Sequence, residues 1–305
     1  MGAPTGPKPA IMRADREGPP FALLGPGRMG TGLALALVRA GWPLVRTWGR
    51  SARGKARART LLGAGTTTRL ARALEGASLV LLGVSDDALA GLAHQLRPWA
   101  PGRSWIHLSG YHGRAPLAPL AEAGGRTLAI HPLQSVPDPR DAPARLAGAV
   151  FTVVAAAADL PLARRLVAAA GGRAVPVPDA GRPLYHAAAV VACNELTALL
   201  DLAARLLDRA TAGGLELAAL RPLVEATLAG LFARGPARAL TGPVVRGDLE
   251  VIRGHLAAIA RQAPWALATY RRLGLETVGL ARRREGRRKT LDRIARLLAG
   301  DDEGS

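Results

Sequence analysis

The sequence has little that would suit a secreted, disulfide-bonded or membrane-spanning protein. Cys193 is its one cysteine in 305 residues, so no disulfide can form within the chain, and this usage favours a reducing compartment. No uninterrupted run approaches the roughly 18 uncharged apolar residues that a membrane span requires. The first twenty residues lack the apolar stretch of a signal peptide. We therefore expect a soluble, cytoplasmic protein.

Aromatic residues and lysines are also scarce. Aromatics make up 4% of the chain, too few for a platform on which nucleic-acid bases could stack. The net charge of +18 is almost wholly due to arginine, because only Lys8, Lys55 and Lys289 are lysines. Arginines in a chain rich in Ala, Gly, Leu and Pro indicate a compositional bias more than a nucleic-acid surface. The densest cluster, 282–289, is expected to be a solvated segment, with contact to an anionic partner as the alternative.

Aliphatic residues, in contrast, are abundant and follow two patterns. Hydrophobic residues make up 49% of the chain, enough for each half to bury a core. Up to about residue 179, short apolar runs alternate with helix-compatible segments, which is typical of an α/β fold with a doubly wound, mainly parallel sheet. The runs that we expect to be strands are 21–24, 44–48, 78–84, 105–108, 127–130, 150–154 and 174–177.

The pattern changes near Asp179, beyond which the sequence shows no strand signal. Residues 184–209 are nearly continuous helix formers, and glycines at 213–214 and 235 separate them from later helices. The sequence therefore predicts an all-α second domain, and the cleft between the domains is the expected place for chemistry. The predicted parts are a flexible leader over 1–19, a dinucleotide-binding domain over 20–179 and a helical domain over 180–300. Helices within the last part are expected at 215–234, 246–260, 263–283 and 290–299.

A glycine-rich turn joins the first predicted strand to the first helix. Gly25-Pro26-Gly27-Arg28-Met29-Gly30 has the spacing G-x-G-x-x-G and directly follows the strand 21–24. The first glycine permits a tight turn, the second lets a pyrophosphate approach the backbone, and the third allows close packing of helix and strand. Free N–H groups at the helix start attract phosphate. This context favours a Rossmann-type dinucleotide site over an incidental turn in a Gly-rich chain.

The end of the second predicted strand distinguishes between the two nicotinamide dinucleotides. An NAD site carries a carboxylate about 20 residues further on, which holds the ribose 2′-hydroxyl. Here the chain continues as Gly49-Arg50-Ser51-Ala52-Arg53, without an acid. Arg50 and Arg53 can hold a 2′-phosphate, and Ser51 can donate a hydrogen bond to it. The segment favours NADP(H), unless these arginines only reflect the overall composition.

Polar residues follow three further strands. Val84 ends the strand 78–84 and Ser85 and Asp86 follow it, and these residues are expected beside the cofactor, although capping of the next helix is the favoured role for Ser85 or Asp86. Ser109 follows the strand 105–108, and His131 follows the strand 127–130. Ligands of open α/β sheets bind at these strand ends, where a histidine can transfer the proton that accompanies hydride movement.

The other interpretation of His131 is a structural histidine in a loop, and this interpretation is favoured for His107, which lies inside its strand. His186 and Asn194 lie eight residues apart on the long helix, near one face and two turns apart. Both are candidates for contact with substrate, or they only meet the other domain. Cys193 is expected to be a small buried filler rather than a nucleophile. No metal site is assigned.

Five motifs in a fixed order resemble those of one protein family. They are 25–30, 107–110, 131–135, 185–194 and 240–248. Together they resemble the Rossmann-like proteins that carry a C-terminal domain of unknown function 2520, over roughly residues 20–280. The resemblance implies an NADP oxidoreductase similar to pyrroline-5-carboxylate reductases and deazaflavin-dependent NADP reductases. It also implies a helical second domain that commonly dimerises, and it implies no particular substrate.

The sequence thus predicts an NADP(H)-dependent oxidoreductase acting on a small carbonyl, imine or hydroxy compound in the interdomain cleft. Its candidate catalytic residues are Ser109, His131, His186 and Asn194. The absence of lysine between Lys55 and Lys289 means that His or Ser must carry the proton. The alternative is a non-catalytic protein that binds NADP(H) and reports redox state to a partner. We expect a homodimer, no membrane contact and no nucleic-acid partner.

Overall fold

The computed structural model describes residues 18–284 and 288–301, which form two compact units that meet in the sequence at Cys193 and Asn194. The predicted leader lies, apart from Gly18 and Pro19, outside the described residues. The last described strand ends at Pro176, before the change of pattern near Asp179, but the first α-helix beyond it, α8 (Arg182–Val190), groups with the strands by its contacts.

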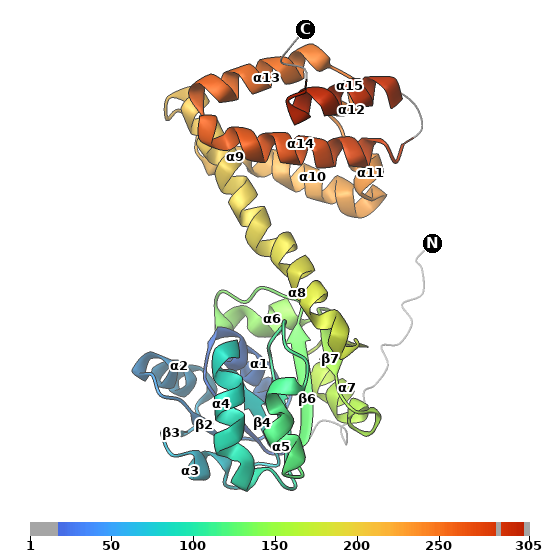
Figure 1. Ribbon diagram of the computed structural model, residues 1–305. Helices are drawn as coiled ribbons and strands as arrows, with labels where there is room; N and C mark the ends of the chain where they lie inside the picture. Colours follow the sequence, from blue (N-terminus) through green and yellow to red (C-terminus); the bar gives the residue numbers. More distant parts are fainter. Residues whose placement is uncertain (1–17, 285–287, 302–305) are drawn as a thin grey trace, which may run out of the picture. The chain divides into compact units, whose positions relative to one another are not determined.

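Within the described residues, the first unit is built on an eight-stranded sheet in the order β3-β2-β1-β4-β5-β6-β7-β8 (Figure 1). Of the neighbouring pairs described, only β6 and β7 run antiparallel. The predicted α/β class with a doubly wound, mainly parallel sheet is therefore confirmed. The strands are β1 (Phe21–Leu24), β2 (Leu44–Trp48), β3 (Thr66–Thr67), β4 (Leu79–Leu82), β5 (Ser104–His107), β6 (Arg126–Pro132), β7 (Val150–Val154) and β8 (Arg173–Pro176).

The strand order reverses direction at β1, since β2 lies on one side of it and β4 on the other. The carboxyl ends of β1 and β4 therefore flank the crevice where such sheets bind ligands. The short edge strand β3 was not predicted. Two threonines carry too little pattern to be recognised as a strand from sequence.

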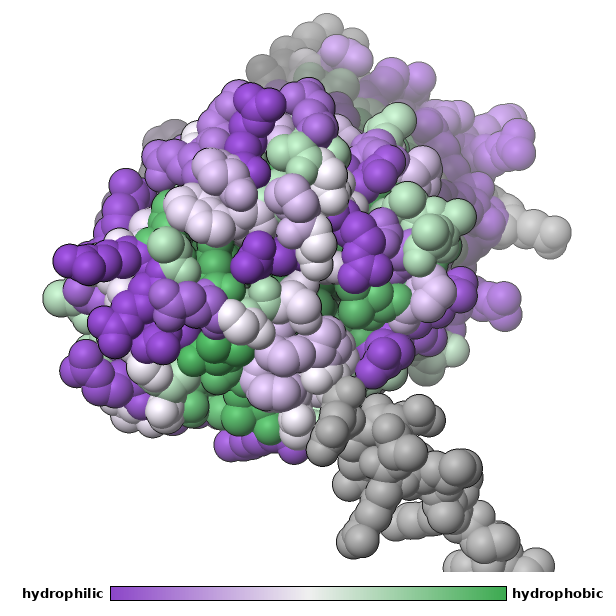
Figure 2. Space-filling model, turned by 90° about the horizontal axis from the view of Figure 1, so that it is seen from below, coloured by the Kyte–Doolittle hydropathy of each residue, from purple (hydrophilic) through white to green (hydrophobic). Residues whose placement is uncertain are grey.

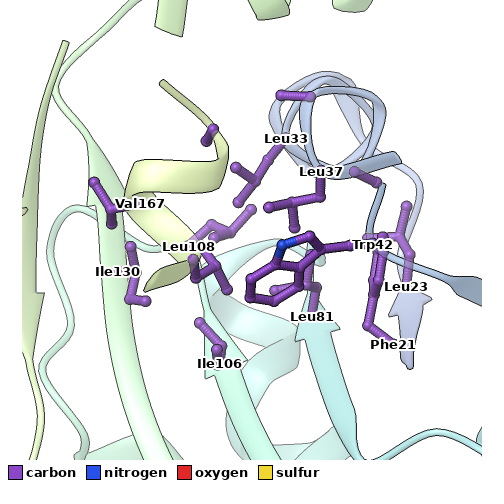
Figure 3. Packing of buried hydrophobic residues seen from close by; sticks show 14 of the residues in the cluster. Phe21, Leu23, Leu33, Leu37, Trp42, Leu81, Ile106, Leu108, Ile130 and Val167 are labelled. Carbon is purple, nitrogen blue, oxygen red and sulfur yellow. The ribbon is translucent and has the colours of Figure 1, made fainter. Parts of the chain in front are cut away.

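Helices cover both faces of this sheet because alternate strand residues point to opposite sides. Leu23 and Leu81 belong to one core, whereas Leu24 and Leu82 belong to the other. Figure 3 shows the Trp42 indole lying between the leucines of α1 and those of the sheet. The first core packs against α1 (Arg28–Arg39), α2 (Ala52–Leu62), α6 (Ala142–Leu146) and α7 (Leu160–Ala169). The second packs against α3 (Leu70–Leu74), α4 (Asp86–Leu96) and α5 (Ala118–Glu122).

The second unit is helical, and its described part contains no strand. Its core is formed mainly by α12 to α15 and includes Ile252, Leu256 and Ile294. The helices α9 and α10, in contrast, bury none of their residues in the single chain. The helices are α9 (Leu196–Thr211), α10 (Arg221–Arg234), α11 (Pro236–Ala239), α12 (Pro243–Arg246), α13 (Leu249–Gln262), α14 (Leu267–Ala281) and α15 (Arg288–Ala299).

One continuous helical segment, Asp179–Thr211, is apolar and long enough to cross a membrane by length and composition alone. It includes α8, a π-helical turn over Val191–Glu195 and α9. Such a segment is not expected from uninterrupted apolar runs, because Asn194 and Glu195 interrupt this one. None of the residues in the most apolar part of this segment is buried.

The surface of the first unit is mixed in character. On the part of it seen in Figure 2, apolar residues lie in patches between hydrophilic ones.

Candidate active site

The glycine turn lies between the end of β1 and the start of α1. Gly25 has a φ of +87°, and a Cβ there would lie 2.5 Å from Cγ1 of Val84. Only glycine fits both the left-handed backbone and this close approach. At Gly30 a Cβ would lie 3.1 Å from the Cα of Gly83, so this glycine allows α1 to pack closely. Gly27 precedes α1 without a capping side chain, which leaves the first N–H groups available to an anion.

A hollow of about 300 Å³ opens beside this turn. Seven of the predicted cofactor residues line it, namely Gly25, Pro26, Gly27, Arg50, Ser51, Val84 and Ser85. The other three do not. Arg28 lines a neighbouring hollow, Met29 packs against the core and Gly30 is buried.

The described lining of this hollow includes Arg50, Arg53 and Arg57 but no carboxylate. Arg53 and Arg57 are one turn apart on α2 and so lie on one face of that helix. Nη1 of Arg57 donates to the carbonyl oxygen of Pro26 at 3.0 Å, which ties α2 to the glycine turn. Arg57 was missed from the sequence, although its spacing from Arg53 was an available signal. The hollow therefore combines free backbone N–H groups with guanidinium groups, a combination that suits phosphate.

Ser51 has a structural role that the sequence analysis did not assign. Its Oγ accepts a hydrogen bond from the backbone N–H of Gly54 at 3.1 Å and caps α2. The hydroxyl hydrogen is still able to donate outward. Ser85 occupies the N-cap position of α4, the alternative considered for it, but its side chain makes no capping bond.

A second hollow adjoins the first, since Trp48, Arg50 and Val84 line both. Its remaining wall is formed by α4 through Ala88, Gly91, Leu92 and Gln95. Nε1 of Trp48 donates to the carbonyl oxygen of Thr68 at 2.9 Å, which fixes the indole. This flat, largely apolar wall suits a planar heterocycle such as adenine. From the sequence, Trp48 is predicted only as the last residue of a strand.

Ser109 lies buried in the loop after β5, and its hydroxyl is fully engaged. Oγ donates to Oδ2 of Asp86 at 2.8 Å and accepts from the backbone N–H groups of Tyr111 (3.2 Å) and His112 (3.0 Å). Asp86 opens α4, so this carboxylate links the β5 loop to the neighbouring helix. Its role as the partner of Ser109 was not predicted. The hydroxyl shapes the loop that follows β5.

His107 supports the same loop from within β5. Its Nδ1 accepts from the backbone N–H of Ser109 at 3.2 Å, so the ring hydrogen lies on Nε2, which donates to the carbonyl oxygen of Gly113 at 2.7 Å. Burial lowers the pKa of His107 to about 4. His107 is therefore neutral at pH 7, and its contacts are those of the structural histidine that we predicted.

His131 lies inside β6 and not beyond it, which corrects the sequence analysis. Antiparallel pairing with β7 continues to Pro132 and Phe151, so the strand is longer than its apolar run. Nδ1 of His131 is 2.7 Å from the hydroxyl of Tyr185 in α8. Burial, followed by the positive charge of Arg182, lowers the pKa of His131 to about 4. The imidazole is thus neutral at pH 7 and hydrogen-bonded on one side.

His186 lies next to His131, with perpendicular rings whose centroids are 6.2 Å apart. Gly110 lies against both imidazoles, because a Cβ there would be 2.5 Å from Nδ1 of His186 and 3.0 Å from Nε2 of His131. Nδ1 of His186 is buried without a hydrogen-bond partner. The structure therefore brings together Ser109, His131 and His186. Asn194 is exposed and belongs to the second unit, so it is not part of this group.

Arg182 is fully buried beside the Ser109 loop and was missed from the sequence. It donates to the carbonyl oxygens of His112 (3.1 Å) and Ser109 and to Oγ1 of Thr152 (2.8 Å). No carboxylate among residues 18–284 and 288–301 lies within ion-pair distance of its guanidinium. Burial lowers its pKa from the ordinary value for arginine. The Ser109 loop is thus anchored to a cation held by neutral acceptors.

Comparison with solved structures shows the same fold in three proteins. A Bacteroides fragilis protein, provisionally described as an NADP oxidoreductase, is 24% identical with a TM-score of 0.69, over 86% of this chain and 97% of that one. An imine reductase from Streptomyces aurantiacus is 22% identical with a TM-score of 0.58, over 93% and 95%. A reductive aminase from Aspergillus terreus, solved with NADPH4, cyclohexanone and allyl amine, is 18% identical with a TM-score of 0.54, over 94% of each chain.

A comparison with the curated proteins returns no match. Family models, in contrast, match both parts of the chain. Residues 19–132 match a Rossmann-like domain, and residues 149–277 match the domain of unknown function 2520. Both matches agree with the motifs and their order in the sequence. The chain therefore belongs to the Rossmann-like proteins that carry a C-terminal domain of unknown function 2520.

Proposed function

We propose that this protein is an NADP(H)-dependent oxidoreductase of a small carbonyl, imine or hydroxy compound. The observation that carries the proposal is the hollow at the glycine turn, where Arg50, Arg53 and Arg57 take the place of the carboxylate of an NAD site. The solved A. terreus reductive aminase, which shares the fold, contains NADPH4. Without these arginines, the fold would indicate a bound dinucleotide but would not distinguish NADP(H) from NAD(H).

The residues of the two hollows fit the parts of NADP(H). The N–H groups at the start of α1, beside Gly25 and Gly27, would hold the pyrophosphate. Arg50 and Arg53 would hold the 2′-phosphate, and Trp48 would lie against the adenine. When bound, the reduced nicotinamide supplies a hydride. His131 and His186, beside the Ser109 loop at the carboxyl edge of the sheet, would orient the substrate and hold the proton that accompanies the hydride. A protein that only senses NADP(H) would need no such group.

The cofactor assignment predicts a loss of NADPH affinity in Arg50→Ala. Because a charge-assisted hydrogen bond contributes about 1.5–3 kcal/mol, the Kd for NADPH should rise roughly 10- to 100-fold. The Kd for NADH, which lacks the 2′-phosphate, should change much less. Fluorescence titration of the full chain with both dinucleotides measures this difference.

The control for this titration is Arg59→Ala. Arg59 lies on the same helix, α2, but it is exposed, bonds to Oγ1 of Thr66 at 3.3 Å and does not line the hollow. It should leave both Kd values unchanged. The proposed function is wrong if the parent protein shows no fluorescence change with NADPH at micromolar concentrations, or if NADH binds as tightly as NADPH.

We further propose that the helical unit forms a homodimer, and that α9 and α10 supply the interface. These helices bury none of their residues in one chain, yet Leu199, Leu223 and Phe232 expose 38%, 66% and 83% of their surfaces. Large apolar side chains exposed together on helices are typical of subunit contacts. Dimer contact also accounts for the unburied apolar helix Asp179–Thr211 without a membrane. The single cysteine and the need for NADPH are consistent with a cytoplasmic location.

The dimer proposal predicts that the double variant Leu223→Asp, Phe232→Asp is monomeric. Two charges cannot be buried at low cost, so sedimentation at micromolar concentration should show half the mass of the parent protein. Leu133→Asp is the control, because Leu133 is 45% exposed in the first unit. This variant should retain the dimer. A monomeric parent protein would contradict the proposal.

A further inference from the structure

Tyr185 makes two contacts, one with His131 and one with Arg182, that cofactor binding does not explain. Its hydroxyl lies 2.7 Å from Nδ1 of His131, and the two rings meet edge to face with centroids 5.6 Å apart. The guanidinium carbon of Arg182 lies 5.5 Å from the centre of the Tyr185 ring. The phenol is therefore in contact with both a neutral imidazole and a buried cation.

The chemistry of the pair determines which partner donates. A phenolic hydroxyl is more acidic than the N–H of a neutral imidazole, and an imidazole nitrogen is a better acceptor than a phenol oxygen. Tyr185 therefore donates to Nδ1, and the ring hydrogen of His131 lies on Nε2. This nitrogen faces Gly110, where a Cβ would lie 3.0 Å away, beside Ser109 at the ligand-binding edge of the sheet.

We propose that the hydrogen bond from Tyr185 fixes His131 as the neutral tautomer whose Nε2–H donates to the oxygen of a carbonyl substrate. This inference rests on the proposed function. The substrate and product are then a carbonyl compound and its alcohol, and not an imine and its amine. Tyr185 acts through His131 and is a positioning residue that also replaces the proton.

The reduction balances as follows. The carbonyl carbon gains a hydride from the reduced nicotinamide, so the nicotinamide is oxidised and the carbonyl is reduced. The π electron pair moves to the oxygen, which takes the Nε2 hydrogen of His131. Nδ1 takes the hydroxyl proton of Tyr185, so His131 remains neutral and Tyr185 becomes a phenolate. Arg182 stabilises this phenolate until solvent returns the proton.

The charges around His131 favour oxygen over nitrogen chemistry. An imine accepts hydride most readily as its protonated cation, which a free carboxylate would stabilise. The groups that act on His131 are Arg182, His186, Asp86 and His107. The one carboxylate of this set, Asp86, accepts from Ser109 at 2.8 Å, and it favours a cation at His131 less than burial and Arg182 oppose one. Arg182 makes no ion pair in the described part of the chain, so its charge opposes a cationic substrate.

The tautomer is tested by ¹⁵N NMR of the histidine side chains in the full chain without cofactor. We expect the hydrogen of His131 on Nε2 at neutral pH and a hydrogen-bonded Nδ1. In Tyr185→Phe the Nδ1 signal should move to the position of an unbonded nitrogen. The control is Tyr270→Phe, because the Tyr270 hydroxyl forms the same contact, at 2.7 Å, with Nδ1 of His255 in the second unit. It should leave the His131 signals unchanged. A hydrogen on Nδ1 of His131, or an imidazolium at neutral pH, overturns the proposal.

The substrate class is tested by NADPH oxidation with carbonyl compounds, alone or with an amine, and with preformed cyclic imines. We expect turnover with carbonyl compounds alone. Tyr185→Phe should lower kcat about 100-fold, in the range of a lost general acid, without changing the Kd for NADPH. Tyr270→Phe should match the parent protein. Turnover confined to imines overturns this inference and leaves the proposed function intact, whereas a failure to bind NADPH overturns the proposed function itself.

Discussion

Replacing Gly25 with alanine is expected to raise the Kd for NADPH by about 100-fold or more. A Cβ at this position would lie 2.5 Å from Cγ1 of Val84 and 2.8 Å from its backbone nitrogen. The left-handed backbone, with φ +87°, adds about 1–2 kcal/mol of strain for any L side chain. The clash with fixed backbone costs a further 1–3 kcal/mol or so, and it is relieved by moving the turn. Moving the turn displaces the N–H groups that would hold the pyrophosphate.

Gly63→Ala separates this effect from general backbone strain. Gly63 ends α2 with a φ of +62°, but a Cβ there would meet nothing within 4 Å. This variant should lose about 1–2 kcal/mol of stability and keep its NADPH affinity. Isothermal titration of both variants, with thermal unfolding as a check of folding, makes the comparison. Equal NADPH affinity in Gly25→Ala and Gly63→Ala would show that the turn does not hold the cofactor.

Acidification from pH 6.5 to pH 4 is expected to lower the free energy of unfolding by about 3 kcal/mol for each of two histidines. Burial, the largest cause in both cases, lowers the pKa of His107 and of His131 from 6.5 to about 4. In this window the unfolded chain binds protons that the folded chain does not, so stability falls as pH falls. The magnitude follows from about 1.4 kcal/mol for each pKa unit. The stabilising contribution is complete above pH 6.5.

Urea unfolding at pH 7 and at pH 5 measures this dependence. His131→Gln should make the difference between the two pH values smaller, since one of the two buried imidazoles is gone. His94→Gln is the control, because His94 is exposed on α4. It should retain the pH dependence of the parent protein. A parent protein equally stable at pH 7 and pH 5 would contradict the predicted burial of neutral imidazoles.

The sequence predicted the strands well where a strand and its apolar run coincide, as in Phe21–Leu24 and Val150–Val154. It failed at β3, where the run is too short, and at the end of β6. There pairing with β7 carries the strand through His131 and Pro132, residues whose types do not indicate a strand. Pairing between distant segments, rather than local pattern, determines such boundaries.

Most of the residues around the proposed cofactor site could be identified from sequence because they are local to one turn and one strand end. Three contributors were missed. Arg57 reaches the turn from α2, Trp48 joins a wall formed by α4, and Arg182 lies 73 residues from the Ser109 carbonyl to which it donates. Only Arg57 carries a sequence signal, its four-residue spacing from Arg53, whereas no local pattern distinguishes Trp48 or Arg182 from other residues of the same type.

The sequence by itself determined the fold class, the glycine turn and the absence of an acid after β2, because each depends on the order of neighbouring residues. Only the tertiary structure decided that His131 bonds to Tyr185, 54 residues away, whose ring contacts a buried arginine without a carboxylate partner in the described chain. The physical reason is that a hydrogen-bond partner and a shifted pKa depend on which distant groups the sheet topology brings together and removes from water.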